Sequence, residues 1–359
     1  MSASIASDPD PESVVLVGSR AGLFLLEPGA GGWSCRGPLL PGLDVSHAVR
    51  DRRDGTLWAA ANDAGGRAGV WRSDDGGATW DGGELPAERA WHVREGRNGE
   101  VYAGVKPAGL LRSDDRGRSW HPVSGLNGHP SREEWWEGGA GLILHTILLP
   151  PGRHGRIYAG ISVAGLYRSD DDGASWTPAN EGTVSMAEVY ASEFGLGRAR
   201  HHGVHRCVHK VAIHPTAPDT LFMQAHDGIY RSDDGGSNWT DIGGGLPSRF
   251  GFPIATAAAN GPAGCAVWVV PQHEETLRTA GHLAVWRSAD GGATWRESKA
   301  GLPAGEHNVL RDAMAARGGE KPTVVFGTTA GTLYASRDGG EQWQAIAKGL
   351  GRIQSVEVG

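Results

Sequence analysis

The chain has 359 residues, of which 39% are hydrophobic and 21% are charged, and its formal net charge is −7. This composition is typical of a folded globular protein and excludes a disordered or collagen-like chain. The acidic balance, with no block of Lys or Arg, argues against a broad surface for nucleic acid. No stretch approaches the roughly 18 apolar residues of a membrane span, and the first residues do not resemble a signal peptide. We therefore expect a cytoplasmic protein that binds neither nucleic acid nor membrane.

A short pattern, Ser-x-Asp-x-Gly-x-x-Trp, recurs along the chain. Its six copies end at Trp80, Trp120, Trp176, Trp239, Trp295 and Trp343, and a degenerate seventh copy, without the Ser and Asp, ends at Trp33. The Asp side chain can accept backbone N–H bonds within a turn, and the Gly provides the positive φ of a tight hairpin. The Trp begins the next strand, where its ring can lie between neighbouring sheets. Each copy therefore predicts a turn between two short strands.

Four short strands are predicted around each copy. In chain order, after a disordered tail at residues 1–12, the innermost strands are expected at 45–50, 90–95, 144–149, 207–214, 251–258, 309–316 and 353–358. A second and a third strand follow each innermost strand, and the fourth begins at the Trp; for 353–358 these partners come from the other end of the chain. Radial repetition of four-stranded sheets is typical of a β-propeller. We predict an all-β fold, a single seven-bladed propeller over residues 13–359, closed by the C-terminal strand joining the N-terminal blade.

Three connections are longer than the repeat requires. They cover residues 121–141, 177–206 and 271–282, and we expect all of them on the face where the innermost strands begin. Long loops on a rigid scaffold are where binding and catalytic residues usually lie. A functional pocket is therefore expected on this face.

The six copies resemble the BNR or Asp-box family, and the resemblance covers essentially the whole chain. Members of that family include sialidases, xyloglucan-active hydrolases, sortilin-type receptors and a photosystem assembly factor. The stretches GLFLL, CVHKVAIHP and FGTTAGTLY resemble a bacterial group of single propellers that are often labelled sialidase or glycosyl hydrolase. The resemblance implies the fold rather than the reaction, because the shared motif is a turn.

The sialidase pattern is not met by these residues. Such enzymes share an Arg-Ile-Pro motif, which this sequence lacks, and a Tyr–Glu nucleophile pair. Five of the six tyrosines lie at repeat positions in predicted strands. Only Tyr190, close to Glu188 and Glu193, is left for a catalytic role.

Histidines recur in the innermost strands. An alignment of these strands places His47, His92, His145 and His209 at one position in four successive blades. Imidazoles that converge from several blades are good metal ligands, so we predict a metal site on the propeller axis. An all-histidine site that supports oxygen chemistry favours Fe(II) or Cu over Zn. Two alternatives stay open: a polar channel in which the histidines bond each other and water, or a site for an anionic small molecule.

Other residues near the channel complete the predicted site. Arg311 is expected to bind a substrate carboxylate, and Asp312 to act as a base, unless the two form an internal ion pair. The further candidates for substrate contact are Trp135, Trp136, His205, Cys207 and Phe252. Trp135 and Trp136 are equally suited to cap the channel mouth, and Cys207 suits the role of a small buried residue.

The leading functional hypothesis is a metal-dependent enzyme, an oxidoreductase, that acts on a small molecule at the channel mouth. A first alternative is a glycoside hydrolase or lyase that uses carboxylates. Its candidate carboxylates are Glu133, Glu134, Glu137, Glu188, Glu193 and Asp312. A second alternative is a non-enzymatic binding or assembly platform. The oligomeric state is left open.

Overall fold

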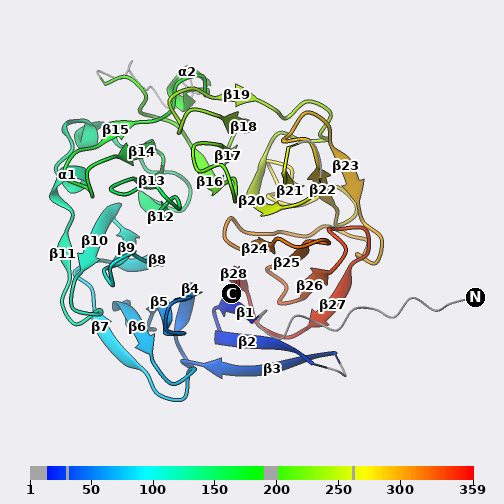
Figure 1. The fold of residues 1–359 in the computed structure, drawn as a ribbon, viewed down its shortest axis with the longest axis horizontal. Coiled ribbons are helices and arrows are strands. Elements are labelled where there is room, and N and C mark those ends of the chain that lie inside the picture. The colour runs from blue at the N-terminus through cyan, green and yellow to red at the C-terminus, as the bar shows by residue number, and fades with distance from the viewer. Residues whose placement is uncertain (1–13, 30–31, 190–200, 261–262) are drawn as a thin grey trace, which may run out of the picture.

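The computed structural model of the protein describes residues 14–29, 32–189, 201–260 and 263–359. In these ranges, seven four-stranded sheets are arranged as blades around a central axis (Figure 1). Strands adjacent in each sheet are antiparallel, and the first strand of each blade lies nearest the axis. The predicted seven-bladed β-propeller is therefore confirmed. The tail predicted at residues 1–12 lies outside the described residues.

The ring closes by pairing of the two ends of the described chain. In blade 1, the C-terminal strand β28 (Ile353–Val358) pairs with β1 (Val15–Ser19), and Val15 lies opposite Val358. The outer strands of this blade are β2 (Gly22–Gly29) and β3 (Gly32–Leu39). The closure predicted from the repeat is confirmed.

The next three blades follow in chain order. Blade 2 consists of β4 (Asp44–Arg50), β5 (Leu57–Asn62), β6 (Ala68–Ser73) and β7 (Asp81–Glu84). Blade 3 consists of β8 (Arg89–Glu95), β9 (Val101–Lys106), β10 (Gly109–Ser113) and β11 (His121–Pro122). Blade 4 consists of β12 (Ile143–Leu148), β13 (Ile157–Ser162), β14 (Gly165–Ser169) and β15 (Thr177–Pro178).

The remaining three blades repeat this arrangement. Blade 5 consists of β16 (Val208–Ile213), β17 (Leu221–Ala225), β18 (Ile229–Ser232) and β19 (Thr240–Asp241). Blade 6 consists of β20 (Gly251–Ala258), β21 (Cys265–Pro271), β22 (Val285–Ser288) and β23 (Arg296–Ser298). Blade 7 consists of β24 (Met314–Arg317), β25 (Thr323–Gly327), β26 (Leu333–Ser336) and β27 (Gln344–Ala347).

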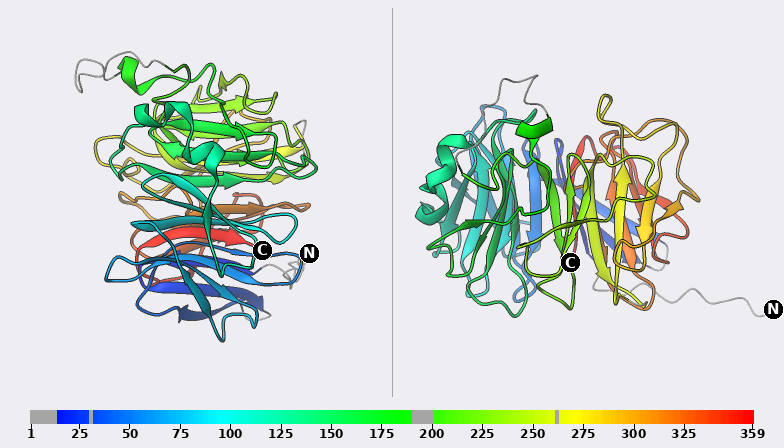
Figure 2. Two further views of the ribbon diagram at one scale, coloured as in Figure 1. Left: turned by 90° about the vertical axis from the view of Figure 1, so that its left-hand side faces the viewer. Right: turned by 90° about the horizontal axis from the view of Figure 1, so that it is seen from above.

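Helices occur only in long connections among the described residues. They are α1 (Ser124–Asn127), the 3₁₀ helix η1 (Pro130–Glu134) and α2 (Met186–Val189). Figure 2 shows α2 at one face of the ring. None of the helices in the described ranges is long and apolar enough to cross a bilayer.

The Ser-x-Asp-x-Gly-x-x-Trp turns join the third and fourth strands on the opposite face, and the copy at 169–176 shows how they form. The Ser169 hydroxyl donates to Asp171 at 2.8 Å, and the backbone N–H of Ser175 donates to the same carboxylate at 2.9 Å. Gly173, at φ 91°, has its N–H directed to the Ser169 hydroxyl at 2.9 Å. Buried Trp176 packs with apolar residues of blades 3 and 4, so each turn also helps to join two blades.

Aromatic residues of the second strands link neighbouring blades. Tyr158 in β13 donates its hydroxyl to the carbonyl of Gly235 in the blade 5 turn at 2.9 Å. Trp268 in β21 donates its indole N–H to the carbonyl of Gly339 in the blade 7 turn at 3.0 Å. Both side chains are fully buried, so each combines a large apolar contact with a satisfied polar group.

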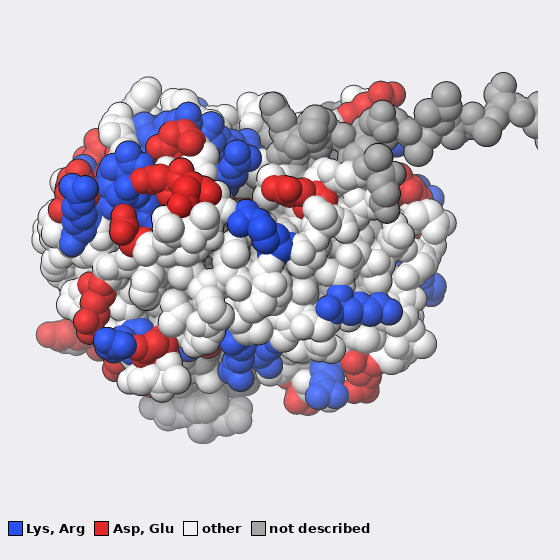
Figure 3. Space-filling model, turned by 90° about the horizontal axis from the view of Figure 1, so that it is seen from below, with Lys and Arg blue, Asp and Glu red and all other residues white. Residues whose placement is uncertain are grey.

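Charged side chains of both signs are interspersed on the surface. In the view of Figure 3, Lys and Arg side chains lie among Asp and Glu side chains rather than in a block of one sign. Arg116, for example, bonds Asp74 of the neighbouring blade at 2.9 Å. Such exposed pairs contribute little to stability individually, so the fold depends on the buried faces of the blades.

The turn carboxylates predict a loss of stability in acid. The Ser175 hydroxyl, then its backbone N–H and the Ser169 hydroxyl, hold the pKa of Asp171 at about 2, below its ordinary 3.8. Because the folded-state pKa is lowered, this stabilisation is complete above about pH 4 and is lost as the pH falls towards about 2. Urea unfolding of the Asp171→Asn variant should show lower stability at pH 7 and a flatter dependence on pH across this window. The neighbouring Asp172→Asn variant is the control, and equal behaviour of the two would contradict the turn's role.

Candidate functional site

The innermost strands of blades 2 to 5 share a bulge. At one point in each strand, a single residue is skipped in the pairing with the second strand. The skipped residues are Ser46, Trp91, His145 and His209. A bulge of this kind redirects side chains, and it is common next to functional sites.

The bulge separates the four predicted histidines into two positions. His145 and His209 are the skipped residues of their strands, whereas His47 and His92 are the residues that follow the bulge. The structural equivalents of His47 and His92 in the next two blades are Thr146 and Lys210. The sequence alignment was thus offset by one residue between the two pairs.

His47 and His92 form part of an axial cluster with Asp312 and Lys210. The two imidazoles stack with their centroids 3.8 Å apart, and one ligand atom from each lies within 4.8 Å of the Asp312 carboxylate. Burial, with positive charges nearby, lowers the pKa of both histidines well below 6.5, so they are neutral. Asp312 is already paired with the ammonium group of Lys210.

His145 belongs to neither three-residue group of potential ligands in the described chain. Its Nδ1 contacts the hydroxyl of Thr146 at 3.0 Å, and burial lowers its pKa well below 6.5. Arg311 lies with its guanidinium carbon 5.9 Å from the ring of Trp91, and its Nε has no hydrogen-bond partner among the described residues. Desolvation lowers the pKa of Arg311, and the charge of Asp312 opposes that shift.

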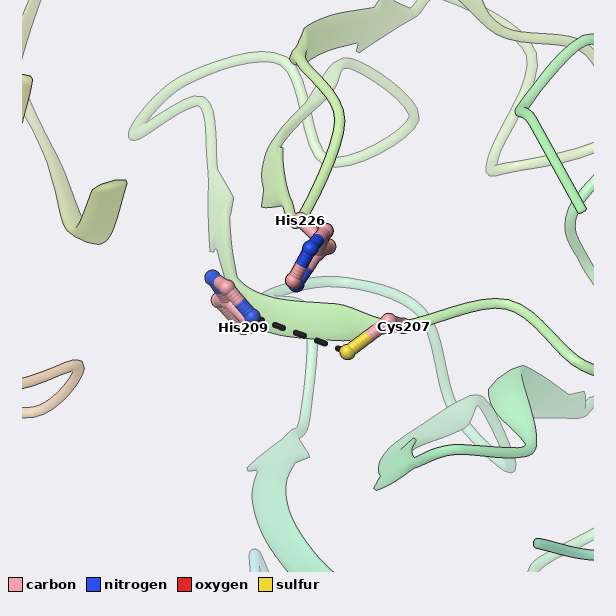
Figure 4. Close-up of side chains that lie close together, drawn as sticks. All are labelled: Cys207, His209 and His226. Carbon is pink, nitrogen blue, oxygen red and sulfur yellow. Dashed lines mark hydrogen bonds between the residues drawn. The ribbon is translucent and has the colours of Figure 1, made fainter. Parts of the chain in front are cut away.

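His209 lies in a lateral cluster with Cys207 and His226. Figure 4 shows His209 on β16, Cys207 just before the start of this strand, and His226 across from them. The Cys207 Sγ is 3.6 Å from His209 Nε2, and one ligand atom from each of the three residues lies within 4.8 Å of the others. A backbone hydrogen bond holds His226 close to Cys207, because the N–H of His226 donates to the carbonyl of Cys207 at 2.9 Å.

A pocket of about 400 Å³ adjoins the lateral cluster on the face of the long connections. His226 is common to the pocket and the cluster. The other walls come from α2, the β17–β18 turn, the β19–β20 connection and the β21–β22 connection. The wall residues with polar or aromatic groups include Asp227, Arg249, Phe250, His273, Glu274 and Glu275. Two of the three connections singled out in the sequence, 177–206 and 271–282, therefore line one pocket.

Two carboxylates of the pocket have defined partners. Glu274 Oε1 lies 2.8 Å from His226 Nε2. Asp227 accepts a hydrogen bond from the Tyr230 hydroxyl. Glu275 is exposed at the pocket wall. The pocket thus brings three acidic side chains to one cavity.

The other predicted contact residues have varied surroundings. Trp135 is buried and donates its indole N–H to Tyr167 at 2.8 Å, as part of the core of blades 3 and 4. Trp136 packs against the small apolar group around Cys207. His205 is buried and contacts the carbonyl of Glu134 at 2.8 Å, and Phe252 lies 4.8 Å from the ring of His209. Tyr190 lies outside the described residues.

The carboxylates proposed from the sequence are dispersed. Asp312 is on the axis, and Glu134 is paired with His201. Glu137 and Glu188 are exposed and do not line the pocket, and Glu193 lies outside the described residues.

Sequence reasoning missed His226, Asp227, Glu274, Glu275 and Lys210 as site residues. His226 could have been predicted as a site residue. It directly follows the second strand of blade 5, and the end of that strand lies opposite the start of the innermost strand of the same blade. The Glu274–Glu275 pair stood within the connection 271–282, which was already expected to reach this face. The position of Lys210 on the axis could not be predicted from the sequence, because it depends on the bulge.

Comparisons with known proteins define the class. No protein-family model matches the chain. An oligoxyloglucan-reducing end-specific xyloglucanase of Emericella nidulans is 24% identical over 262 residues, which are 65% of this chain and 31% of that enzyme. The chain therefore spans less than a third of the length of this curated relative.

Solved structures give the same architecture. An ancestral GH74 enzyme has a TM-score of 0.57 and 16% identity over 90% of this chain and 39% of that chain. YCF48 from Cyanidioschyzon merolae has a TM-score of 0.55 and 16% identity over 86% of this chain and 87% of that chain. The chain is thus a seven-bladed β-propeller that is related in sequence to xyloglucanases and similar in fold to YCF48.

These findings correct the leading functional hypothesis. The metal-dependent oxidoreductase, with its iron or copper chemistry, is wrong, because the relatives in sequence are glycoside hydrolases. The physical reason lies in the bulge, which separates the four histidines. Within the described residues, no group of potential ligands contains more than two histidines. The glycoside hydrolase alternative fits the relatives better.

The axial ion pair predicts a large effect of removing one partner. Lys210→Met leaves the Asp312 carboxylate, which is 3% exposed, buried without its counter-ion, so stability should fall by roughly 3–5 kcal/mol in urea unfolding. The double variant Lys210→Met/Asp312→Leu should recover most of that loss. Lys299→Met, which removes the exposed partner of Glu297, is the control and should change stability by less than about 1 kcal/mol. Equal effects of the two single variants would contradict this account.

Proposed function

We propose that this chain is a glycoside hydrolase that binds a carbohydrate in the pocket beside His226. The observation that supports this most strongly is the gathering of Asp227, Glu274 and Glu275 around one cavity of about 400 Å³. Hydrolysis of a glycosidic bond uses two carboxyl groups, one as the acid and one as the base or nucleophile. The sequence relationship to xyloglucanases supports a polysaccharide or oligosaccharide as the substrate.

The pocket has the mixture of groups that a sugar requires. Phe250 offers an aromatic surface for the apolar C–H groups of a sugar ring, and Arg249 offers donors for its hydroxyls. Arg249 donates to the carbonyl of Asp227 at 3.1 Å and pairs with Asp241, which holds its guanidinium at the pocket wall.

The carboxylates differ in how they are held. His226 orients Glu274, and the Tyr230 hydroxyl orients Asp227, so both are positioned before the substrate enters. Glu275 is free to turn towards a bound ligand on the exposed side. In the proposed reaction, one carboxylic acid protonates the leaving oxygen, and a second carboxylate activates water or attacks the sugar.

The Ser-x-Asp-x-Gly-x-x-Trp turns support a place for this chain among the Asp-box propellers. Because these turns lie on the face opposite the pocket, they contribute to the scaffold and not to the reaction. The specificity then depends on the connections that line the pocket.

An activity assay on xyloglucan oligosaccharides tests this proposal. The full chain should release new reducing ends, and at least two of Asp227→Asn, Glu274→Gln and Glu275→Gln should lower kcat by about 100-fold or more. Glu320→Gln, an exposed carboxylate remote from the pocket in the β24–β25 turn, is the matched control and should keep full activity. Oligosaccharide binding without turnover would refute hydrolysis, and activity that survives all three pocket substitutions would refute this site.

A further inference from the structure

We propose that Cys207, His209 and His226 form a Zn²⁺ site next to the pocket. This inference is independent of the proposed hydrolase activity, because it concerns only the ligand set of the lateral cluster. The thiolate and two imidazoles are a donor set typical of zinc. With three protein ligands, one coordination position stays open for water or for a ligand in the pocket.

The geometry fits a tetrahedral ion. With Zn–S near 2.3 Å and Zn–N near 2.0–2.1 Å, two ligands of one tetrahedral Zn²⁺ lie about 3.6 Å apart. The observed distance from Cys207 Sγ to His209 Nε2 is 3.6 Å. The ligand atom of His226 lies within 4.8 Å of both, so a small closing movement of its ring completes the set.

Both imidazoles are anchored through another ring nitrogen. His209 Nδ1 donates to the carbonyl of Gly251 at 2.6 Å, so its Nε2 lone pair faces Cys207. His226 Nε2 bonds Glu274 at 2.8 Å, so Nδ1 carries the lone pair in the neutral ring. Carbonyl and carboxylate partners of this kind orient histidine ligands and make them more basic.

Binding of a cation at Cys207 would be coupled to loss of the thiol proton. Cys207 lies in an apolar group with Val163 and Met186, and its Sγ is 3.9 Å from the Ser162 hydroxyl. Burial raises the pKa of the Cys207 thiol to about 11, with the Ser162 hydroxyl and the charge of Arg311 opposing it. The free thiol is therefore protonated at neutral pH, and binding of a cation would release that proton.

The axial cluster is the weaker candidate for a cation. It also offers three potential ligands, but the ammonium group of Lys210 already occupies the Asp312 carboxylate. A divalent ion there would have to displace a buried positive charge.

Calorimetric titration of the untagged, chelator-treated full chain with ZnCl₂ tests the proposal. We expect one Zn²⁺ per chain, and about 100-fold or more weaker binding in Cys207→Ser and His226→Ala. Cys265→Ser, a buried thiol in blade 6, and His202→Ala, an exposed imidazole, are matched controls that should bind as the parent does. Circular dichroism checks folding, and His226→Ala is the safer variant because that side chain is 20% exposed.

Substitution with Co²⁺ gives a second readout that a purely structural cluster would not produce. A thiolate-to-cobalt charge-transfer band should appear in the near ultraviolet for the parent chain and for Cys265→Ser, but not for Cys207→Ser. Absence of stoichiometric Zn²⁺ binding, or of this band in the parent chain, would overturn the proposal. So would undiminished Zn²⁺ binding in His226→Ala. Zinc binding by a chain that hydrolyses no oligosaccharide would refute only the hydrolase function.

Discussion

The pairing of β28 with β1 holds seven sheets at fixed angles to one another. A blade alone has two apolar faces, and only the closed ring covers both of them with neighbouring blades. Once the ring is closed, the innermost strands lie side by side around the axis (Figure 1). The stacking of His47 on His92 and the pairing of Lys210 with Asp312 both join different blades.

The turns and strands of the fold could be predicted from the sequence because they have local causes. The turn at 169–176 follows from a Ser, an Asp and a Gly at fixed spacing, and the apolar strands on either side follow from β-propensity. Closure by residues 353–358 followed from counting: the first blade lacked an innermost strand, and the last segment supplied one. The turns and strands depend on few residues that are close in the chain, whereas the closure, which joins its two ends, followed from the number of repeats.

The site depended on features without a local signature. The bulge that separates His47 from the level of His145 has no sequence marker, yet one skipped residue moves a side chain to another position. The approach of Glu274 to His226 depends on how two connections from different blades fold over each other. A search for repeated histidines therefore found His209 but not its partner His226, whereas Cys207, two positions away in the sequence, was already a candidate.

The ring closure also determines how the protein would respond to mechanical force. Val15 begins β1 and Val358 ends β28, and these two residues are direct partners in an antiparallel pair. Tension applied at the two ends of the described chain would peel β28 from β1. The hydrogen bonds of this pair would then break one after another, starting at Val15 and Val358, instead of being sheared together. The first blade would thus open at low force, and the remaining blades, each a single continuous hairpin array, would then be released from an unclosed ring.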